Sequence, residues 1–155
     1  MRVVLFRGKR TDNNEWVYGS PLFQDGYVLI RFWNSEEFEW EEHLVIPETV
    51  GQLTGLADKN YTNIFEGDII SVGCNKRLMY VQFNEESLTW ELTDVGVSAC
   101  EVNHLDNTFD LGEIQVEAAY GEMVSEVIGN IHDNPELWNR RTNDEFHKKM
   151  ADETL

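Results

Sequence analysis

The stretch from Ile64 to Ile70 constrains the fold more than any other part of the chain. It reads Ile-Phe-Glu-Gly-Asp-Ile-Ile, an apolar pair followed by an acidic turn around one glycine and then by β-branched residues. Glycine adopts backbone conformations that are closed to other residues, and β-branched side chains favour strands. The stretch therefore predicts a chain that turns a tight corner at Gly67 and enters a buried strand.

Composition supports a mainly β fold. The chain has 155 residues, 41% of them hydrophobic, and includes five Trp, five Tyr and eight Phe. This is enough for one domain with a real core, which argues against wholesale disorder. The many turn-forming and aromatic residues favour strands over a helical bundle. No segment reaches the roughly 20 apolar residues of a membrane-spanning helix, and we expect no signal peptide.

Turn signals divide the first part of the chain into short strands. A polar turn over residues 11–14 separates two extended stretches and predicts an opening hairpin. Asp25-Gly26 predicts a second hairpin with a two-residue loop, because both positions tolerate a positive φ. The next run, residues 27–33, is so continuously apolar that we expect a strand covered on both faces.

Residues 37–41 alternate glutamate with aromatic side chains, the pattern of a strand that has one solvent-exposed face. Pro47 lacks the N–H group that a central strand needs, so we expect this strand to end near Ile46. The segment from Thr49 to Asn63 contains two glycines, Asp58 and two asparagines. We expect an ordered loop there.

The second half of the chain predicts a three-stranded meander and a closing strand. These strands are expected over residues 68–72, 78–83, 88–92 and 124–131. Together they favour a small, strongly bent β-barrel of the SH3-like kind. Residues 95–123 contain repeated breaks, and we expect a long excursion with one or two short strands. We find no internal repeat.

A C-terminal helix is expected over residues 135–150. Asn134 suits the N-cap, and Pro135 suits the first helical position. The fold class is therefore mainly β with a terminal helix (α+β), in one domain over residues 1–155. Its parts are an N-terminal β segment (1–60), the SH3-like β part (61–133) and the helix (134–150).

The chain is strongly acidic, with 29 Asp and Glu against 12 Lys and Arg and a net charge of −17. No Lys or Arg occurs between Arg77 and Arg140. Such a surface repels phosphate backbones, so nucleic-acid binding over a broad face is disfavoured. The excess charge fits solubility and mutual repulsion between copies. Cys74 and Cys100 have no Cys-x-x-Cys spacing, and we expect both to be reduced in the cytoplasm.

Three blocks of sequence follow one another in order. The first joins Phe6-Arg7-Gly8-Lys9 to Trp16-Val17-Tyr18-Gly19, the second runs from Pro47 to Ile70, and the third runs from Val127 to Leu137. Together they resemble the YopX family of phage and prophage proteins. The resemblance implies a two-part, β-rich fold, a phage or prophage origin, and a location in the cytoplasm of the bacterial host. It brings no activity and no catalytic residues.

The residues that carry these blocks are expected to be structural. They are Arg7, Gly8, Trp16, Gly19, Gly55, Glu66, Gly67, Asp68, Gly129, Asn130 and Pro135. Arg7 could meet a phosphate or a carboxylate, but in so acidic a chain we favour an internal pair with Glu66 or Asp68. Glu66 and Asp68 could hold a cation together, yet a turn carboxylate more often accepts main-chain N–H groups.

No motif predicts a catalytic, cofactor or metal site. The chain has neither a phosphate-binding glycine loop nor a nucleophile elbow. Its four histidines show no His-x-x-x-His spacing and no His/Cys cluster. His104 with Asp106, and His132 with Asp133, are the candidate ligand pairs.

We expect a non-enzymatic binding module that forms homo-oligomers, with a host protein as a further candidate partner. The aromatic content and the missing catalytic motifs support this function. The alternative is an acidic DNA mimic, in which residues 78–139 imitate DNA phosphates and inhibit a host nucleic-acid-binding protein. Weaker alternatives are a nucleic-acid-binding module that uses the terminal basic clusters and a hydrolase with a His/Asp/Glu cleft. No membrane association is expected.

Overall fold

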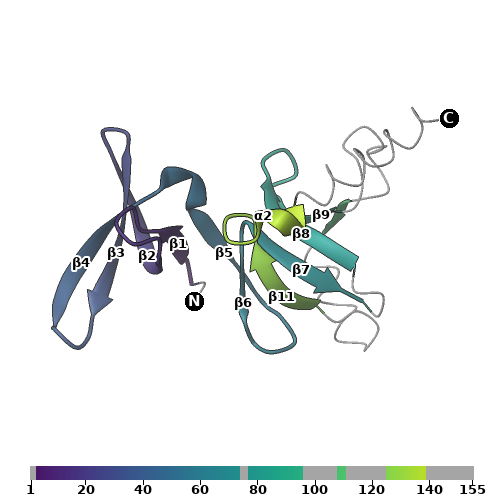
Figure 1. Ribbon diagram of the computed structural model, residues 1–155, viewed down its shortest axis with the longest axis horizontal. Coiled ribbons are helices and arrows are strands. Elements are labelled where there is room, and N and C mark those ends of the chain that lie inside the picture. Colours follow the sequence, from purple (N-terminus) through teal and green to yellow (C-terminus); the bar gives the residue numbers. More distant parts are fainter. Residues whose placement is uncertain (1–2, 74–76, 96–107, 111–124, 139–155) are drawn as a thin grey trace. The chain divides into compact units, whose positions relative to one another are not determined.

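The computed structural model describes residues 3–73, 77–95, 108–110 and 125–138 (Figure 1). The chain divides into two compact units: the first comprises residues 1–56 and 63–66, and the second comprises 57–62 and 67–155. One sheet has six strands and the other has five, so the predicted mainly β class is confirmed. The boundary between the units falls at the predicted corner, since Glu66 belongs to the first unit and Gly67 to the second.

The first sheet is a meander whose later strands return beside its first strand. Its strands are β1 (Phe6–Lys9), β2 (Trp16–Gln24), β3 (Tyr27–Asn34), β4 (Glu39–Val45), β5 (Gly51–Ala57) and β6 (Asn63–Phe65). They lie in the order β4-β3-β2-β1-β5-β6. The long strand β2 pairs with β1 through residues 16–19 and with β3 through residues 20–24. A bridge between Arg10 and Val45 also joins the end of β4 to the chain just after β1.

The predicted hairpins of this unit are confirmed. β1 and β2 form the opening hairpin, and Asp25 and Gly26 make the two-residue loop between β2 and β3. Their φ angles of 46° and 85° are the positive values that such a loop requires. The strand before Pro47 ends at Val45, and a short 3-10 helix, Pro47–Thr49, follows it.

The core of the first unit lies on one side of β3 and β4. Val28, Ile30 and Val45 are buried together, and Phe6, Val17 and Val50 pack against them. Gly8 faces this cluster, because a Cβ built there would lie 3.0 Å from a methyl carbon of Val45. The missing side chain therefore lets β1 approach the core closely.

One expectation about the faces of these strands is wrong. Residues 27–33 are not covered on both sides, because Tyr27 is 61% exposed and Trp33 is 48% exposed. In the next strand, Trp40 is 60% exposed while Glu41 is half-buried. The pairing register places Trp40 opposite Trp33, and this puts both indoles on the side away from Ile30.

Strand β5 occupies residues 51–57 of the loop expected between Thr49 and Asn63, so that prediction is wrong over those residues. Gly51 and Gln52 pair with Arg7 and Phe6 of β1. Gly51 is a packing residue, because a Cβ there would lie 2.6 Å from the carbonyl oxygen of Glu66. Of the two glycines that suggested a loop, Gly51 allows close approach within the sheet, whereas Gly55 has a φ of 88° and open space around its Cβ position.

The second sheet confirms the predicted meander and closing strand. Its strands are β7 (Asp68–Val72), β8 (Arg77–Asn84), β9 (Thr89–Asp94), β10 (Thr108–Asp110) and β11 (Ser125–Asn130), in the order β10-β9-β8-β7-β11. All five residues of β7 are buried. β10 is a short strand within the predicted excursion. The strand order describes an open sheet, and the SH3-like barrel stays a prediction.

The two sheets share one topology within the described strands. In each, four consecutive strands form a meander, and a fifth strand pairs antiparallel with the first of the four. Thus β5 lies beside β1 as β11 lies beside β7. The sequence patterns did not predict this equivalence.

The C-terminal part is described only to residue 138. Helix α2 (Pro135–Trp138) begins at Pro135, as predicted, and the remainder of the expected helix lies outside the described residues. Cys74 and Cys100 also lie outside them. None of the helices in the described part of the chain has the length and apolarity that a bilayer crossing needs.

Candidate functional site

The side of β2, β3 and β4 that faces away from the core carries large exposed side chains. Alternation along β3 puts Tyr27, Leu29, Arg31 and Trp33 on this side, because Val28 and Ile30 point to the core. Directly paired residues share a face, which adds their partners on β2 and β4. We call this side the aromatic face; it consists of Ser20, Leu22, Gln24, Tyr27, Leu29, Arg31, Trp33, Trp40, Glu42 and Leu44.

The strand register arranges the aromatic face in rows. Leu22, Leu29 and Leu44 form an apolar row across the three strands. Two residues further along β3, Arg31 pairs with Glu42, and two further still, Trp33 pairs with Trp40. The face therefore has an ionic row between a leucine row and a tryptophan row.

The tryptophan row is an ordered aromatic pair. The rings of Trp33 and Trp40 meet edge to face, with 5.4 Å between their centroids. The guanidinium of Arg31 lies 5.6 Å from the ring centroid of Trp40. These contacts fix both indoles while leaving 48% and 60% of the two residues exposed.

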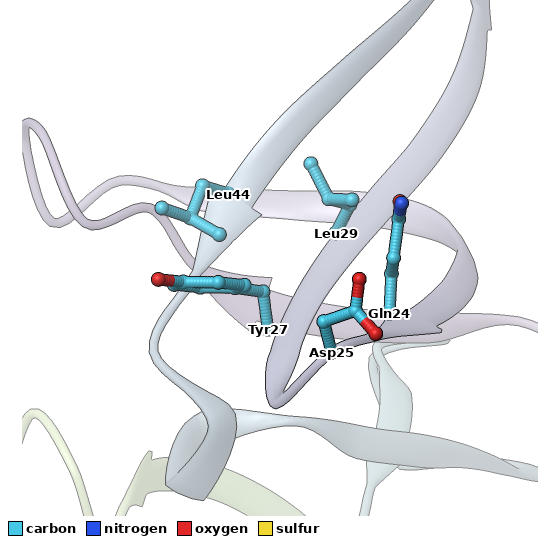
Figure 2. Close-up of a pocket in the computed structure, with 5 residues that line it drawn as sticks. All are labelled: Gln24, Asp25, Tyr27, Leu29 and Leu44. Atoms are coloured by element: carbon cyan, nitrogen blue, oxygen red, sulfur yellow. The ribbon is translucent and has the colours of Figure 1, made fainter.

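A shallow hollow of about 400 Å³ lies beside the leucine row. Figure 2 shows its lining, in which the side chains of Tyr27, Leu29 and Leu44 converge while Gln24 and Asp25 stand at one side. The lining is thus mainly apolar, with two polar groups at the hairpin loop.

The ionic row contains one salt bridge. Nε of Arg31 lies 3.0 Å from a carboxylate oxygen of Glu42, and the two side chains are 46% and 40% exposed. The basic and acidic charges of this row balance each other. A neutral row of this kind stands out in a chain whose net charge is −17.

Arg7, the first predicted motif residue, is a buried structural cation. It is only 7% exposed and lies between the rings of Trp16 and Phe65, at 4.6 and 4.9 Å from their centroids. Its Nη2 donates to the main-chain carbonyl of Glu66 at 3.1 Å. This bond reaches the backbone of the corner and not a carboxylate, so the expected internal pair of Arg7 with the charge of Glu66 or Asp68 stays a prediction.

Glu66 is half-buried beside this stack. Burial raises the pKa of its carboxyl above the ordinary value, although the N–H group of Gln52 donates to it at 3.5 Å. Asp68, which the sequence offered as an alternative partner of Glu66 at a cation, belongs to the second unit and is 1% exposed. Gly67, between them, has a φ of 85°.

The other motif residues also lie at tight backbone positions. A Cβ at Gly19 would clash with the carbonyl oxygen of Arg31, and one at Gly129 would clash with the side chain of Asn134. Gly55 has a φ of 88°. The side-chain oxygen of Asn130 accepts the N–H groups of His132 and Asp133, at 3.0 and 2.9 Å, and so shapes the turn before Pro135.

Asp58 is a structural residue that the sequence analysis did not single out. Its carboxylate accepts main-chain N–H groups of Asn60 and Thr62 at 2.8 and 2.9 Å, and of Val127 at 3.0 Å. Burial raises the pKa of this carboxyl, but the main-chain donors outweigh burial, and the net pKa lies below its ordinary value. The Asp-x-Asn spacing is the local signal, because an aspartate often accepts the N–H two residues later.

Two hairpins of the chain, β3–β4 and β8–β9, have the same loop. Asn34 begins one loop, and its side-chain oxygen accepts the N–H groups of Glu36 and Glu37 while its amide donates to Glu41. Asn84 begins the other and makes the same three bonds, to Glu86, Ser87 and Glu91. Each loop ends on an exposed apolar residue with a positive φ, Phe38 at 54° and Leu88 at 57°. Aromatic pairs flank both loops, since Phe83 meets Trp90 with a centroid distance of 5.0 Å.

Acidic residues described between positions 78 and 138 are partly engaged within the second unit. Asp94 forms an ion pair with Arg77, and Glu126 lies 2.6 Å from Nζ of Lys59. Among the residues that the structure describes, no three His, Cys, Asp or Glu side chains gather in a way that could hold a metal ion. His104, one of the predicted ligands, lies outside that part of the chain.

These observations define an antiparallel β protein of two compact units, one of which exposes an aromatic face. The family model described as YopX protein matches residues 5–139, and the chain belongs to the YopX family. Its structure is similar to the crystal structure of protein EF1440 from Enterococcus faecalis, with a TM-score of 0.52 and 23% sequence identity. The likeness covers 89% of this chain and 99% of that chain, and it shows the fold. No curated protein matches the chain.

Proposed function

We propose that this YopX protein is a non-enzymatic binding module that assembles with copies of itself through the aromatic face. The observation that carries the proposal is the exposure of Trp33, Trp40 and Tyr27 on one side of one sheet. We further propose that it is a phage or prophage product that acts in the cytoplasm of the bacterial host. Family membership supports that setting.

The chemistry of the aromatic face is that of an interface. Large apolar patches on a monomer commonly mark sites of protein association, and Trp and Tyr are enriched at the centres of such sites. Trp33 and Trp40 are held by each other and by Arg31, so little side-chain freedom remains to be lost on binding. The face is therefore exposed and partly preorganised.

Charge favours a neutral contact surface between copies. Two chains that each carry −17 repel one another, and this repulsion is weakest where charges are absent or paired. The aromatic face has its basic and acidic groups in one salt bridge. The outer edge of β4 is less suitable, because Arg10 already pairs with its end and its neighbouring loop carries Glu36 and Glu37. Charged residues at an edge oppose strand pairing.

Sedimentation equilibrium of the purified chain tests the proposal. We expect a mass that rises with protein concentration above the 18.0 kDa of one chain. Tryptophan emission should shift to shorter wavelength over the same range, because association removes water from the indoles. A single 18.0 kDa species from micromolar to millimolar concentration would contradict the proposed self-association.

A further inference from the structure

We propose that two copies meet aromatic face to aromatic face about a two-fold axis that runs parallel to the strands between β3 and β4. This inference rests on the proposed self-association and adds its geometry. Under this axis, Arg31 of each copy lies opposite Glu42 of the other. The contact is isologous, so each pairing occurs twice.

The row arrangement selects this axis. A two-fold axis along the strands lays each row on the same row of the other copy, with β3 over β4. Trp33 then faces Trp40, and Leu29 faces Leu44. An axis across the strands would instead place Arg31 on Arg31 and Glu42 on Glu42. The first arrangement pairs opposite charges, whereas the second opposes like charges.

The spacing of the rows fits the stacking of two sheets. Side chains two residues apart on a strand lie about 7 Å from each other, and stacked sheets lie about 10 Å apart. Arg31 and Glu42 have long side chains that can cross this separation, and they already lie 3.0 Å from each other within one copy. Four alternating charges would then form a closed network at the centre of the contact.

The hollow at the leucine row provides room for the other copy. Its volume is about 400 Å³, and Leu29 and Leu44 form part of its lining (Figure 2). Under the proposed axis, the leucine row of the second copy lies over this hollow. The second copy would then cover the exposed side of β3. Residues 27–33 would be buried on both sides in the dimer, as their apolar sequence predicts.

Charge-reversal variants test this geometry. Arg31→Glu and Glu42→Arg should each fold, because an exposed ion pair contributes little to stability. We expect each variant alone to associate at least tenfold more weakly than the wild type, since like charges then meet at the centre. An equimolar mixture should recover association, because the glutamate introduced at position 31 of one chain then faces the arginine introduced at position 42 of the other.

A second surface pair supplies the matched control. Lys59 and Glu126 lie 2.6 Å apart and are each 42% exposed. Lys59→Glu and Glu126→Lys change the net charge of the chain by the same amounts as the two test variants. We expect both controls to associate within about twofold of the wild type.

The outcomes separate the geometry from the proposed function. Recovery in the mixture, with unaffected controls, supports the face-to-face contact. Association of the wild type that neither Arg31→Glu nor Glu42→Arg weakens would overturn the contact and leave self-association standing. Equal effects of the test and control variants would show dependence on net charge and also overturn it. A wild type that is only 18.0 kDa would overturn both.

To guard against misfolding, circular dichroism of each variant should match that of the wild type. Trp40→Ala adds an uncharged test, with Trp90→Ala as its counterpart in the equivalent hairpin. We expect Trp40→Ala to weaken association at least tenfold and Trp90→Ala to leave it unchanged. Unchanged association in folded Trp40→Ala would count against the contact.

Discussion

At the scale of single residues, the absence of a side chain at Gly19 allows β2 and β3 to approach each other closely. A Cβ at this position would meet the carbonyl oxygen of Arg31 on β3, and a backbone atom cannot move away as a flexible side chain can. We expect Gly19→Ala to lower the free energy of unfolding by about 1–3 kcal/mol through overpacking. Urea denaturation at pH 7 measures this change.

The neighbouring exposed residue Ser20 is the control for this substitution. Ser20→Ala changes an exposed position on the same strand, and we expect a change within about 0.5 kcal/mol. If Gly19→Ala were as stable as Ser20→Ala, the close approach of β2 to β3 would be refuted.

The carboxylate of Asp58 is expected to contribute to the free energy of unfolding in a pH-dependent way. Its carboxylate holds three main-chain N–H groups, and a hydrogen bond to a charged acceptor contributes about 1.5–3 kcal/mol. We expect Asp58→Asn to lower the free energy of unfolding at pH 7 by about 2–3 kcal/mol, because one of its two side-chain atoms becomes a donor.

The sign of the pH effect follows from the lowered pKa. A carboxyl whose pKa is lower in the folded chain stabilises it fully above the ordinary value of 3.8, and this contribution is lost as the pH falls through the folded pKa. The difference in stability between wild type and Asp58→Asn should therefore be constant from pH 7 to about 5 and shrink below about 4. Urea denaturation across this range measures it, and a difference that grew toward low pH would contradict the assignment.

At the scale of elements, the two equivalent loops each contain a residue in the same unfavourable backbone conformation. Leu88 is 73% exposed and has a φ of 57°, a conformation that costs a residue with a Cβ about 1–2 kcal/mol. Asparagine tolerates this conformation better. We expect Leu88→Asn to raise the free energy of unfolding by about 1 kcal/mol, as measured by urea denaturation.

Leu88→Ala separates strain from lost apolar contact. Alanine keeps the Cβ and therefore the strain, so it should not stabilise the chain. If Leu88→Ala stabilised the chain as much as Leu88→Asn, the gain would come from removing the leucine side chain and not from relieving backbone strain. Neither substitution touches the aromatic face, so self-association should be unchanged.

Most elements could be predicted because their signals are local. Asp25-Gly26 and the corner at Gly67 have turn chemistry that neighbouring residues determine, and both were found in place. β5 could not be predicted, because Gly51 allows close approach to Glu66 and pairs with β1, and both contacts lie far away in sequence. The shared hairpin loop does have a sequence signal, because four of the eight residues from Asn34 to Glu41 are identical to their counterparts from Asn84 to Glu91.

At the scale of the whole molecule, the candidate site was the part that sequence could not predict. Alternation in residues 37–41 predicts a strand, but pairing with β3 decides which side faces the core. Trp33, which the apolar run predicted to be covered, and Trp40 both lie exposed. Arg7 contacts two aromatic rings and a main-chain carbonyl, and the aromatic face consists of residues that no motif marked.

Net charge predicts how salt acts on the proposed assembly. Two copies at −17 each repel over long range, whereas the aromatic contact between them is short-ranged and mostly apolar. Raising NaCl from 20 to 500 mM screens the repulsion, and we expect the dissociation constant of self-association to fall several-fold in sedimentation equilibrium. Ionic contacts would respond in the opposite sense, since salt weakens attraction between unlike charges.

The Arg31→Glu and Glu42→Arg mixture, whose recovery depends more on charge, should therefore gain less from salt than the wild type. A wild-type assembly that dissociated as salt rose would show that attraction between charges, and not the apolar rows, holds the copies together.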